Sequence, residues 1–541
     1  MVNYNSENKN DSKQFFSGVT ILALSTFIVK LIGMFYKIPM IALIGAEGMG
    51  YFNSAYEIYS LLFVISTTGI PVAISILISE NRAQGKYRVI KQIYRVSVYL
   101  LGIIGLIGTL IMAIFYEKLA FAINNNNSAF CILAISPTLF MICLSSAIRG
   151  YFQGNQIMLP TAISQVIEAL GKLLLGLGFA FIGVKKGYPI HQVAALAVLG
   201  LSIGVALSLL YLWLFKIFRP ISIYRTIGKI DVESHSNILK NLLRIAIPVT
   251  ISSTILSLTK IIDMTMILSR LSDISYSQED ANSIYGAYST MAVSIYNLPL
   301  TLISSIALPL VPLLTSAIEE NNNAKEKNTL SIALKLTGLI AFPTGLGVAV
   351  FSKPILELLF ATQIKEIEYV APLLSILGLT IFLSAMISVT NAILQSYKSV
   401  RTPIISITIG ILIKIILAYA LIGIPQVNIY GAPISTFFST AAIVSINMYF
   451  IIKQTGAINS ILNLFGKTFI SAFISVGIGM ILFLLISQIY YSRIVTLALI
   501  VFVAIIYSFT IIKSEAVTES EILQIPHGEK ILRVLKKIHL V

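Results

Sequence analysis

The sequence predicts an all-α polytopic membrane protein with about fourteen transmembrane helices, arranged as two parallel six-helix repeats and a final helix pair. Hydrophobic residues make up 57% of the 541 residues and charged residues only 11%, and the mean hydropathy is +0.89. Soluble domains carry about 25% charged residues, so this chain lacks the polar surface that water on all sides requires. The net charge of +15 is spread over loops and tails. A nucleic-acid-binding protein concentrates its charge on one soluble face, so no nucleic acid partner is expected.

Each predicted helix is an apolar run of about 20 residues or more, long enough to cross about 30 Å of hydrocarbon with its backbone groups bonded internally. The first sixteen residues are polar, and the first run is longer than the apolar core of a cleavable signal peptide, so we expect it to be retained. The predicted helices are 17–43, 52–79, 93–115, 129–152, 160–183, 192–217, 243–268, 284–314, 330–352, 369–396, 402–424, 430–452, 467–488 and 493–512.

Basic residues gather in alternate connections between these helices. They cluster at 82–91, 216–229, 325–327 and 398–401 and in the C-terminal tail, whereas the intervening connections are poor in base or acidic. The positive-inside rule therefore places both termini in the cytoplasm. No connection is longer than about 30 residues, which leaves no room for a soluble catalytic domain.

The two halves of the chain resemble each other. Residues 141–183 are similar to 383–423. Three pairs of residues match between the halves: Gln153 with Gln395, Lys172 with Lys414, and Lys30 with Lys260. Six helices separate the copies, an even number, so both halves have the same orientation. Parallel repeats of this kind place a substrate site near the membrane midplane between them.

This repeat divides the chain into six parts. They are a cytoplasmic N-tail at 1–16, an N-lobe at 17–218, a cytoplasmic linker at 219–242, a C-lobe at 243–452, the last two helices at 464–513 and a basic tail at 517–541. The last two helices lack charge between their ends, so they face either lipid or a lipid-like tail. In the basic tail, apolar and basic residues alternate at helical spacing from residue 529, which favours an amphipathic helix on anionic membrane lipids over a partner-binding or frayed end.

Several ionisable residues fall inside the predicted spans. A charge at the bilayer centre costs about 2.5–3.5 kcal/mol, so such residues normally face a cavity or a partner. With Lys37 counted, six are basic and three acidic, and a positive, water-lined cavity suits an anion with several oxygens, such as a pyrophosphate. The candidate anion-binding residues are Lys30, Lys260, Lys172, Lys414 and Arg149; the candidate coupling or gating residues are Asp263, Glu168 and Glu57.

Spacing offers a competing interpretation for two of these pairs. Glu168 and Lys172 are four residues apart, and Lys260 and Asp263 are three apart, so each pair lies on one helix face. The sequence leaves open whether they are static salt bridges or whether Asp263 exchanges its lysine for an ion. Arg149 is either a positive anchor at the cytoplasmic helix end or a first phosphate contact.

Catalytic chemistry is not visible in the sequence. The four histidines lack metal-ligand spacing, the two cysteines share one apolar run, and no Gly-rich phosphate loop ends in Gly-Lys-Ser or Gly-Lys-Thr. We therefore expect no metal site, no ATP hydrolysis and no enzyme activity.

The helix plan and four segments resemble a known family. The segments are FIVKLIGMFYKIPMIALIGAEGMGYFNSAYEIYSLL, TTGIPVAISILISE, RGYFQG and the basic tail. They are similar to the stage V sporulation protein B and polysaccharide-export branch of the multidrug/oligosaccharidyl-lipid/polysaccharide (MOP) flippase superfamily, which includes lipid II flippases. The resemblance covers essentially the whole chain.

This resemblance implies a two-lobe transporter in a bacterial plasma membrane that works by alternating access. Its substrate would be a polyprenyl-pyrophosphate-linked saccharide for cell-wall, capsule or spore biogenesis, with Lys30 and Lys260 at the pyrophosphate and the last two helices around the lipid tail. Cell-wall synthesis machinery is an implied partner. No cofactor is implied, and the coupling stays open between sodium ions, protons and the membrane potential, as do the glycan and the oligomeric state.

Two other functions compete with that of a flippase. A multidrug cation antiporter of the same superfamily is expected to carry an acidic residue in its first helix, where this chain has Lys30 and Lys37. An integral-membrane cell-wall enzyme is expected to show a large outer catalytic loop or an acidic metal motif. The chain departs from Gram-negative flippases in one respect, because it has lysine where they favour arginine.

Overall fold

In this computed structural model, the structure describes residues 4–218, 233–399, 401–455, 461–489 and 492–516. Every regular element assigned among these residues is a helix. The predicted amphipathic tail at 517–541 lies outside the described residues, as does 219–232 of the predicted linker. The contacts divide the chain into two units, Met1–Thr290 and Met291–Val541, each described by itself. The predicted lobes, which are defined by the repeat, stay predictions.

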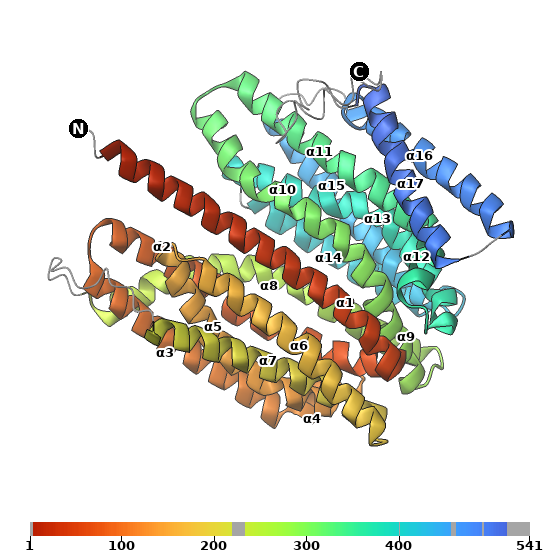
Figure 1. Cartoon of the computed structure of the whole chain (residues 1–541), viewed down its shortest axis with the longest axis horizontal. Coiled ribbons are helices and arrows are strands. Elements are labelled where there is room, and N and C mark those ends of the chain that lie inside the picture. The colour runs from red at the N-terminus through yellow and green to blue at the C-terminus, as the bar shows by residue number, and fades with distance from the viewer. Residues whose placement is uncertain (1–3, 219–232, 400, 456–460, 490–491, 517–541) are drawn as a thin grey trace. The chain divides into compact units, whose positions relative to one another are not determined.

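The first unit contains nine α-helices, which Figure 1 labels in chain order among its described residues. They are α1 (Tyr4–Thr67), α2 (Gly69–Ala83), α3 (Tyr87–Ile114), α4 (Tyr116–Ala122), α5 (Ala129–Gly154), α6 (Leu159–Lys185), α7 (Ile190–Phe218), α8 (His235–Asp273) and α9 (Gln278–Ala287). A π-helical turn, Tyr288–Ala292, follows α9.

The described part of the second unit contains eight α-helices. They are α10 (Val293–Glu319), α11 (Asn323–Val350), α12 (Ser352–Leu359), α13 (Ile364–Ser396), α14 (Arg401–Ile422), α15 (Gly431–Thr455), α16 (Ile461–Ile489) and α17 (Arg493–Lys513). Of these, α12 is a short helix that the hydropathy pattern did not predict, as is α4 in the first unit.

From the third predicted helix on, the observed helix ends lie within nine residues of the predicted ones. The start of the chain differs, because the helix begins at Tyr4 and continues through the predicted loop at 44–51. Twelve described segments are long and apolar enough to cross a membrane, and the first of them, Leu24–Ala83, is 60 residues long. The chain is thus a multi-pass membrane protein, and the count of fourteen spans stays a prediction.

Gly45 interrupts α1. Its φ of 66° and ψ of −179° are not helical, and residues with a Cβ avoid this conformation. The helix therefore consists of two segments, before and after Gly45. The first corresponds to the predicted span 17–43, and the second together with α2 corresponds to the predicted span 52–79. This break separates Lys30 and Lys37 from Glu57 along the same element.

The predicted internal repeat is visible in the helix positions. Gln153 and Gln395 are each the residue before the last of their helices, α5 and α13. Lys172 and Lys414 are each the fourteenth residue of the helix that follows, α6 and α14. The two units therefore repeat this helix pair with its glutamine and its lysine in equivalent places.

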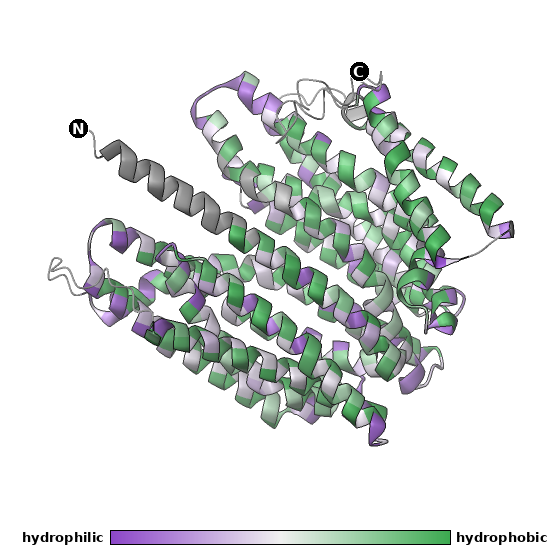
Figure 2. Ribbon diagram, viewed as in Figure 1, coloured by the Kyte–Doolittle hydropathy of each residue, from purple (hydrophilic) through white to green (hydrophobic). Residues whose placement is uncertain are grey.

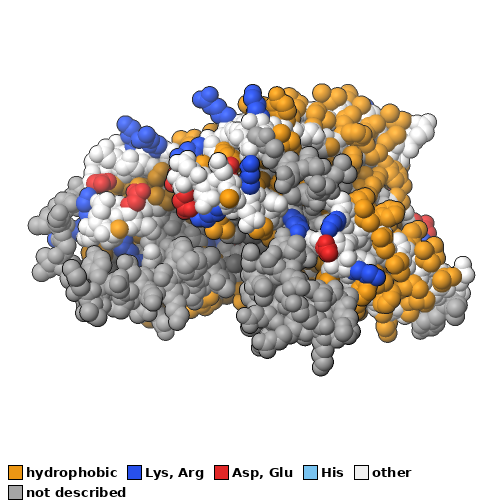
Figure 3. Space-filling model, turned by 90° about the horizontal axis from the view of Figure 1, so that it is seen from above, with side chains coloured by type: hydrophobic (Ala, Val, Ile, Leu, Met, Phe, Trp, Pro, Cys, Tyr) orange, Lys and Arg blue, Asp and Glu red, His pale blue; other side chains and the backbone are white. Residues whose placement is uncertain are grey.

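Apolar residues run along most of the length of the helices, and hydrophilic residues gather near their ends (Figure 2). Hydrophobic side chains cover a broad area of the face in Figure 3, at the end where Figure 1 shows α16 and α17. Exposed residues there include Phe473, Ile481, Leu485, Ile494 and Ile505. Such a continuous apolar surface is what a lipid environment requires.

The last two helices have no charged residues in their middle parts, and they contact each other and the second unit through hydroxyl groups. α16 and α17 contact each other through four hydroxyl side chains, Ser471, Ser475, Thr510 and Ser514, which we call the hydroxyl ladder. Its cross-helix distances are 3.0 Å between Ser475 Oγ and Thr510 Oγ1 and 3.1 Å between Ser471 Oγ and Ser514 Oγ. The Tyr507 hydroxyl of α17 donates to the backbone oxygen of Leu339 on α11 at 2.8 Å. The pair is thereby tied to the second unit.

Candidate functional site

Seven of the eight site residues predicted from the sequence lie in the first unit. α1 carries Lys30 and Glu57, α5 carries Arg149, α6 carries Glu168 and Lys172, and α8 carries Lys260 and Asp263. Lys414 lies on α14 of the second unit, where its side chain is buried. Because each unit is described by itself, a site between the two halves stays a prediction. The geometry that follows belongs to the first unit.

Four charged side chains join α1 to α8. Lys37 and Glu57 come from α1, on either side of the Gly45 break, and Lys260 and Asp263 come from α8. α1 and α8 pack against each other, and the other three charged groups lie within electrostatic range of the Glu57 carboxylate. We call these four residues the α1–α8 charge cluster. Its two lysines and two carboxylates carry no net charge together.

Glu57 differs from the other members of this cluster. Its Oε2 atom is buried and accepts no hydrogen bond from any residue that the structure describes. A buried acceptor without a donor costs about 1–3 kcal/mol, and more when it is charged. Lys37 Nζ donates to the backbone oxygen of Ser289 at 3.5 Å, and the Lys260 side chain is exposed. The cluster thus holds a buried carboxylate oxygen that has no hydrogen-bond donor among the described residues, near two ammonium groups.

Arg149 and Glu168 form an ion pair, with Arg149 Nη2 2.9 Å from Glu168 Oε2. The guanidinium also donates to Ser164 Oγ at 3.0 Å and to Ser208 Oγ at 3.1 Å, so it joins α5, α6 and α7. The spacing-based pairing of Glu168 with Lys172 is therefore replaced by a pairing with Arg149. The planar guanidinium presents several donors at fixed angles, and it satisfies the carboxylate and both hydroxyls at once.

Lys172 lies among three aromatic rings of α1. Its Nζ is 4.9 Å from the ring centre of Tyr36, 5.5 Å from that of Phe52 and 4.8 Å from that of Tyr56. An ammonium group over the face of an aromatic ring gains about 0.5–2 kcal/mol, depending on how far it is desolvated. The three rings therefore offset part of the cost of burying the Lys172 ammonium group.

A second polar contact joins α1 to α9 and contains no charged side chain. We call its five residues the α1–α9 clamp: Asn53, Asn125, Asn282, Ser289 and Thr290. The hydrogen bonds run from Asn53 Nδ2 to Ser289 Oγ (2.8 Å) and Thr290 Oγ1 (2.8 Å), from Asn125 Nδ2 to Asn282 Oδ1 (2.7 Å), and from Asn282 Nδ2 to the Glu47 backbone oxygen (2.8 Å). The segments that border it, 124–127 and 273–280, belong to connections that the sequence predicts to be outside the cell.

Two glycines bring the backbones of α1 and α9 into contact at this clamp. A Cβ atom on Gly286 would lie 1.9 Å from the backbone oxygen of Ala46, and one on Gly50 would lie 2.3 Å from that of Asn282. No side chain fits at such distances. The two glycines therefore allow the close approach on which the hydrogen bonds of the clamp depend.

Sequence reasoning found the charged residues but missed the aromatic and amide groups beside them. Phe52 and Tyr56 are four residues apart on α1, a spacing that places two rings on one helix face and that the sequence contains. The asparagines of the clamp gave no comparable signal, since nothing local indicates that Asn53 and Thr290 meet. Among the described residues, no group of three or more His, Cys, Asp or Glu is arranged to hold a metal ion.

Comparison with known proteins finds related sequences over most of the chain. The family model for polysaccharide biosynthesis proteins matches residues 15–318, and the MatE model matches residues 283–420. The lipid II flippase MurJ of Bacillus subtilis (strain 168) is 24% identical over 440 residues, which are 79% of this chain and 80% of that protein. Stage V sporulation protein B of the same organism is 26% identical over 427 residues, 78% of this chain and 80% of its own length.

A solved structure resembles the chain over nearly its whole length. A lipid II flippase MurJ in an inward closed conformation covers 91% of this chain and 98% of its own, with a TM-score of 0.67 and 17% sequence identity. At that identity the similarity shows that the two chains share a fold.

Proposed function

This chain belongs to the polysaccharide biosynthesis protein family of the MOP superfamily of flippases and transporters, and we propose that it moves a polyprenyl-pyrophosphate-linked saccharide across a bacterial plasma membrane. The substrate class is lipid II or a related cell-envelope precursor, carried from the inner to the outer leaflet by alternating access with both termini in the cytoplasm. The observation that carries the proposal is the group of lysines that α1, α6 and α8 bring into one unit.

The charge balance of that unit favours an anionic ligand. Within the predicted spans the Arg149–Glu168 pair is neutral, so four lysines remain against the two carboxylates of the α1–α8 charge cluster. The lysines are Lys30, Lys37, Lys172 and Lys260. A surplus of two ammonium groups suits a pyrophosphate, because ammonium is a point-charge donor to phosphate oxygens. We place Lys414, the repeat equivalent of Lys172, on the same substrate from the second half.

Arg149 then has a different role from the lysines. Its guanidinium is already bonded to Glu168, Ser164 and Ser208, so an incoming phosphate would have to displace these partners. We assign the Arg149–Glu168 pair to holding α5, α6 and α7 together. Either residue contacts substrate only if that pair opens during the transport cycle.

The charge cluster supplies a mechanism for coupling. When pyrophosphate takes the ammonium groups of Lys37 and Lys260, Glu57 and Asp263 lose the positive charge that compensates them. A carboxylate in that position takes up a proton or a sodium ion, which links ion occupancy to substrate occupancy. Glu57 is the first candidate, because its Oε2 atom is buried without a donor among the described residues, and Asp263 is the second.

Reconstitution in liposomes tests the proposed substrate. Purified protein is given labelled lipid II or one other polyprenyl-linked glycan, and movement across the bilayer is measured for each. We expect transport of one of them to fall at least tenfold in Lys30→Gln and Lys260→Gln, and to persist in the control Lys185→Gln, whose side chain is exposed at the end of α6. Transport at the wild-type rate in both site variants would refute the pyrophosphate site.

One observation favours a second candidate function. The MatE model matches residues 283–420, so a multidrug cation antiporter of the same superfamily is the alternative. The same liposomes distinguish the two, with a fluorescent organic cation in place of the lipid. Cation efflux driven by a proton or sodium gradient, with no movement of either glycan lipid, would replace the flippase by an antiporter.

A further inference from the structure

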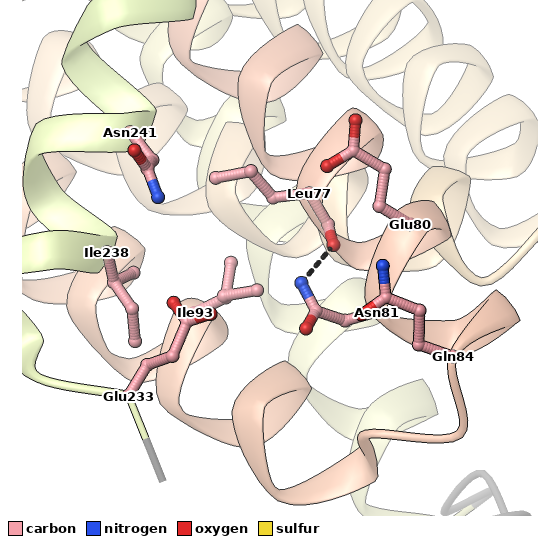
Figure 4. Close-up of a pocket in the computed structure, with 8 residues that line it drawn as sticks. All are labelled: Leu77, Glu80, Asn81, Gln84, Ile93, Glu233, Ile238 and Asn241. Carbon is pink, nitrogen blue, oxygen red and sulfur yellow. Dashed lines mark hydrogen bonds between the residues drawn. The ribbon is translucent and has the colours of Figure 1, made fainter. Parts of the chain in front are cut away.

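The first half of α3 carries basic side chains along its exposed face. Arg88, Lys91 and Arg95 are exposed and are spaced three and four residues apart, so they lie on one face of the helix. The opposite face packs inside the unit, since Ile93 is buried there and lines a cavity of about 130 Å³ together with residues of α2 and α8 (Figure 4). We call the three exposed basic residues the α3 basic row.

This row has no acidic residues beside it in the sequence. The segment 81–116 contains five basic residues and neither aspartate nor glutamate. In the second unit, by contrast, the exposed Lys325 pairs with Glu320, with Nζ 2.9 Å from Oε2. Neither Arg88 nor Arg95 has an ion-pair or hydrogen-bond partner for its side chain among the residues that the structure describes. The two arginines therefore carry positive charge that no described carboxylate neutralises.

Beyond the row, the same face of α3 becomes first aromatic and then apolar. Tyr99, four residues after Arg95, is 72% exposed, and exposed apolar side chains follow at Ile103, Leu106 and Leu110. Their spacing of four, three and four residues keeps them on the face of the basic row. A tyrosine between charged and apolar residues is typical of a membrane interface. Charge, ring and hydrocarbon thus follow one another in the order of a lipid's headgroup, interfacial region and acyl chain.

A fourth cation, from another helix, lies at the edge of this row. Lys216 is in the last turn of α7, and its Nζ atom is 2.9 Å from the ring centre of Tyr94, the residue before Arg95. The same atom is 5.1 Å from the ring centre of Tyr151 on α5. Two aromatic rings thus hold this ammonium group in place. The positive surface is therefore formed by two helices, and part of it is fixed by packing.

We propose that the α3 basic row, with Lys216 beside it, binds the phosphate of an anionic glycerophospholipid of the phosphatidylglycerol type. The lipid would lie in the leaflet at this end of α3, which the sequence predicts to be cytoplasmic. The planar guanidinium of arginine presents paired N–H donors that match two phosphate oxygens, and lysine adds a point charge. Basic residues beside a membrane span also attract anionic lipids electrostatically.

The apolar continuation of the row decides between a lipid and a soluble anion. A free phosphate would contact the basic side chains alone, whereas one acyl chain of a phospholipid would also lie along Tyr99, Ile103 and Leu106. Because these side chains are exposed on the same face, the surface fits a headgroup together with its chain. The bound lipid would remain at the outside of the first unit, on residues that belong neither to the α1–α8 charge cluster nor to the surroundings of Lys172.

The single tryptophan of the chain provides the test. Trp213 is exposed on α7, three residues before Lys216, and bromine atoms on a lipid chain quench tryptophan fluorescence at close contact. The full chain is reconstituted in phosphatidylcholine bilayers that contain increasing fractions of phosphatidylglycerol with brominated chains. Brominated phosphatidylcholine gives the reference. We expect the association constant at Trp213 to be larger for phosphatidylglycerol by at least about threefold.

Variants assign this preference to the row. The double variant Arg88→Gln/Arg95→Gln should bring the ratio of the two association constants to about one, because the headgroup loses both guanidinium groups. Arg95→Glu alone places a negative charge on the row and should lower the ratio below one. The control Lys185→Gln/Lys186→Gln removes two exposed charges at the other end of the membrane, after α6, and should keep the wild-type ratio.

Four results would overturn the proposal. They are equal quenching by the two lipids in the wild type, an unchanged ratio in the arginine variants, an equal loss in the lysine control, and loss of the preference when inorganic phosphate is added at constant ionic strength. The last result would assign the arginines to a soluble anion. Arg95→Glu keeps the test decisive if the double variant does not fold. Because no transport is measured, the outcome is independent of the proposed flippase function.

Discussion

α1 makes two polar contacts of opposite kinds, one with α9 and one with α8. In the α1–α9 clamp, amide donors meet oxygen acceptors at 2.7–2.8 Å, and glycines bring the backbones together, although the Asn125 Oδ1 atom is buried without a donor among the described residues. In the α1–α8 charge cluster, four ionisable groups meet, the Oε2 atom of Glu57 has no donor among the described residues, and Lys260 is exposed.

The difference distinguishes groups that stabilise the structure from groups that are suited to binding a ligand. Short hydrogen bonds between neutral groups specify one geometry and lose energy when it changes. Charged groups inside a membrane protein are costly in the empty state and gain when a charged ligand arrives. Substitutions in the clamp should therefore lower stability, whereas substitutions in the cluster should change transport and leave stability nearly unaltered.

The largest effect is expected for Gly286→Ala. The new Cβ atom would lie 1.9 Å from the Ala46 backbone oxygen, so α1 and α9 would have to separate. We expect the free energy of unfolding to fall by about 3 kcal/mol, measured by denaturation in detergent. Gly178→Ala on α6 is the control, because nothing lies within 4 Å of its new Cβ. Equal stability of the two variants would show that the close approach at Gly286 does not hold the clamp.

A smaller loss is expected for Asn53→Ala, which removes the hydrogen bonds to Ser289 and Thr290 and leaves both hydroxyls without this donor. The expected decrease is about 1–2 kcal/mol in the free energy of unfolding. Thr290→Val removes only one acceptor and should lose about half as much. A variant as stable as the wild type would contradict the structural role given to the clamp.

Glu57→Gln should change the free energy of unfolding in the opposite direction. It removes a carboxylate whose Oε2 atom is buried with no donor in the described part of the chain, so stability should rise or stay within about 0.5 kcal/mol of the wild type. Substrate binding should persist while the dependence of flipping on the ion gradient is lost. Asp263→Asn is the matched variant for the second candidate. Loss of more than about 2 kcal/mol in Glu57→Gln would assign Glu57 to the structure and not to coupling.

The smallest change in stability is expected for Lys260→Gln. The side chain is exposed, and surface substitutions of this kind usually stay within about 0.5 kcal/mol. Its effect on transport, by contrast, should be among the largest. A variant that unfolds more easily and still transports would reverse the distinction drawn between the cluster and the clamp.

Hydropathy predicted the helices well because each span must form its backbone hydrogen bonds internally in lipid. Such a span needs a continuous run of apolar residues, which the local sequence shows directly. Hydropathy did not predict the features that do not depend on crossing the lipid. Gly45 breaks α1 without a polar loop, so the observed helix runs through the predicted gap at 44–51. The short helices α4 and α12 lack the length that the pattern detects.

Only a part of the candidate site could likewise be predicted from the sequence. Charged residues inside apolar runs are conspicuous, so Lys30, Lys172, Lys260, Glu57 and Asp263 were found from the sequence. Their partners depend on tertiary packing. Spacing along one helix suggested that Glu168 pairs with Lys172, but a neighbouring helix supplies Arg149 at 2.9 Å. The aromatic rings around Lys172 and the amides of the clamp are likewise contributed by segments far apart in the sequence.

The hydroxyl ladder between α16 and α17 bears on how the protein is made. Each of its side chains also accepts or donates to a backbone group of its own helix pair, as when Ser475 Oγ donates to the Ser471 backbone oxygen at 2.6 Å. The contacts of the ladder are internal to the pair and involve no other helix. We therefore expect α16 and α17 to associate with each other as a hairpin even when they are produced without the rest of the second unit.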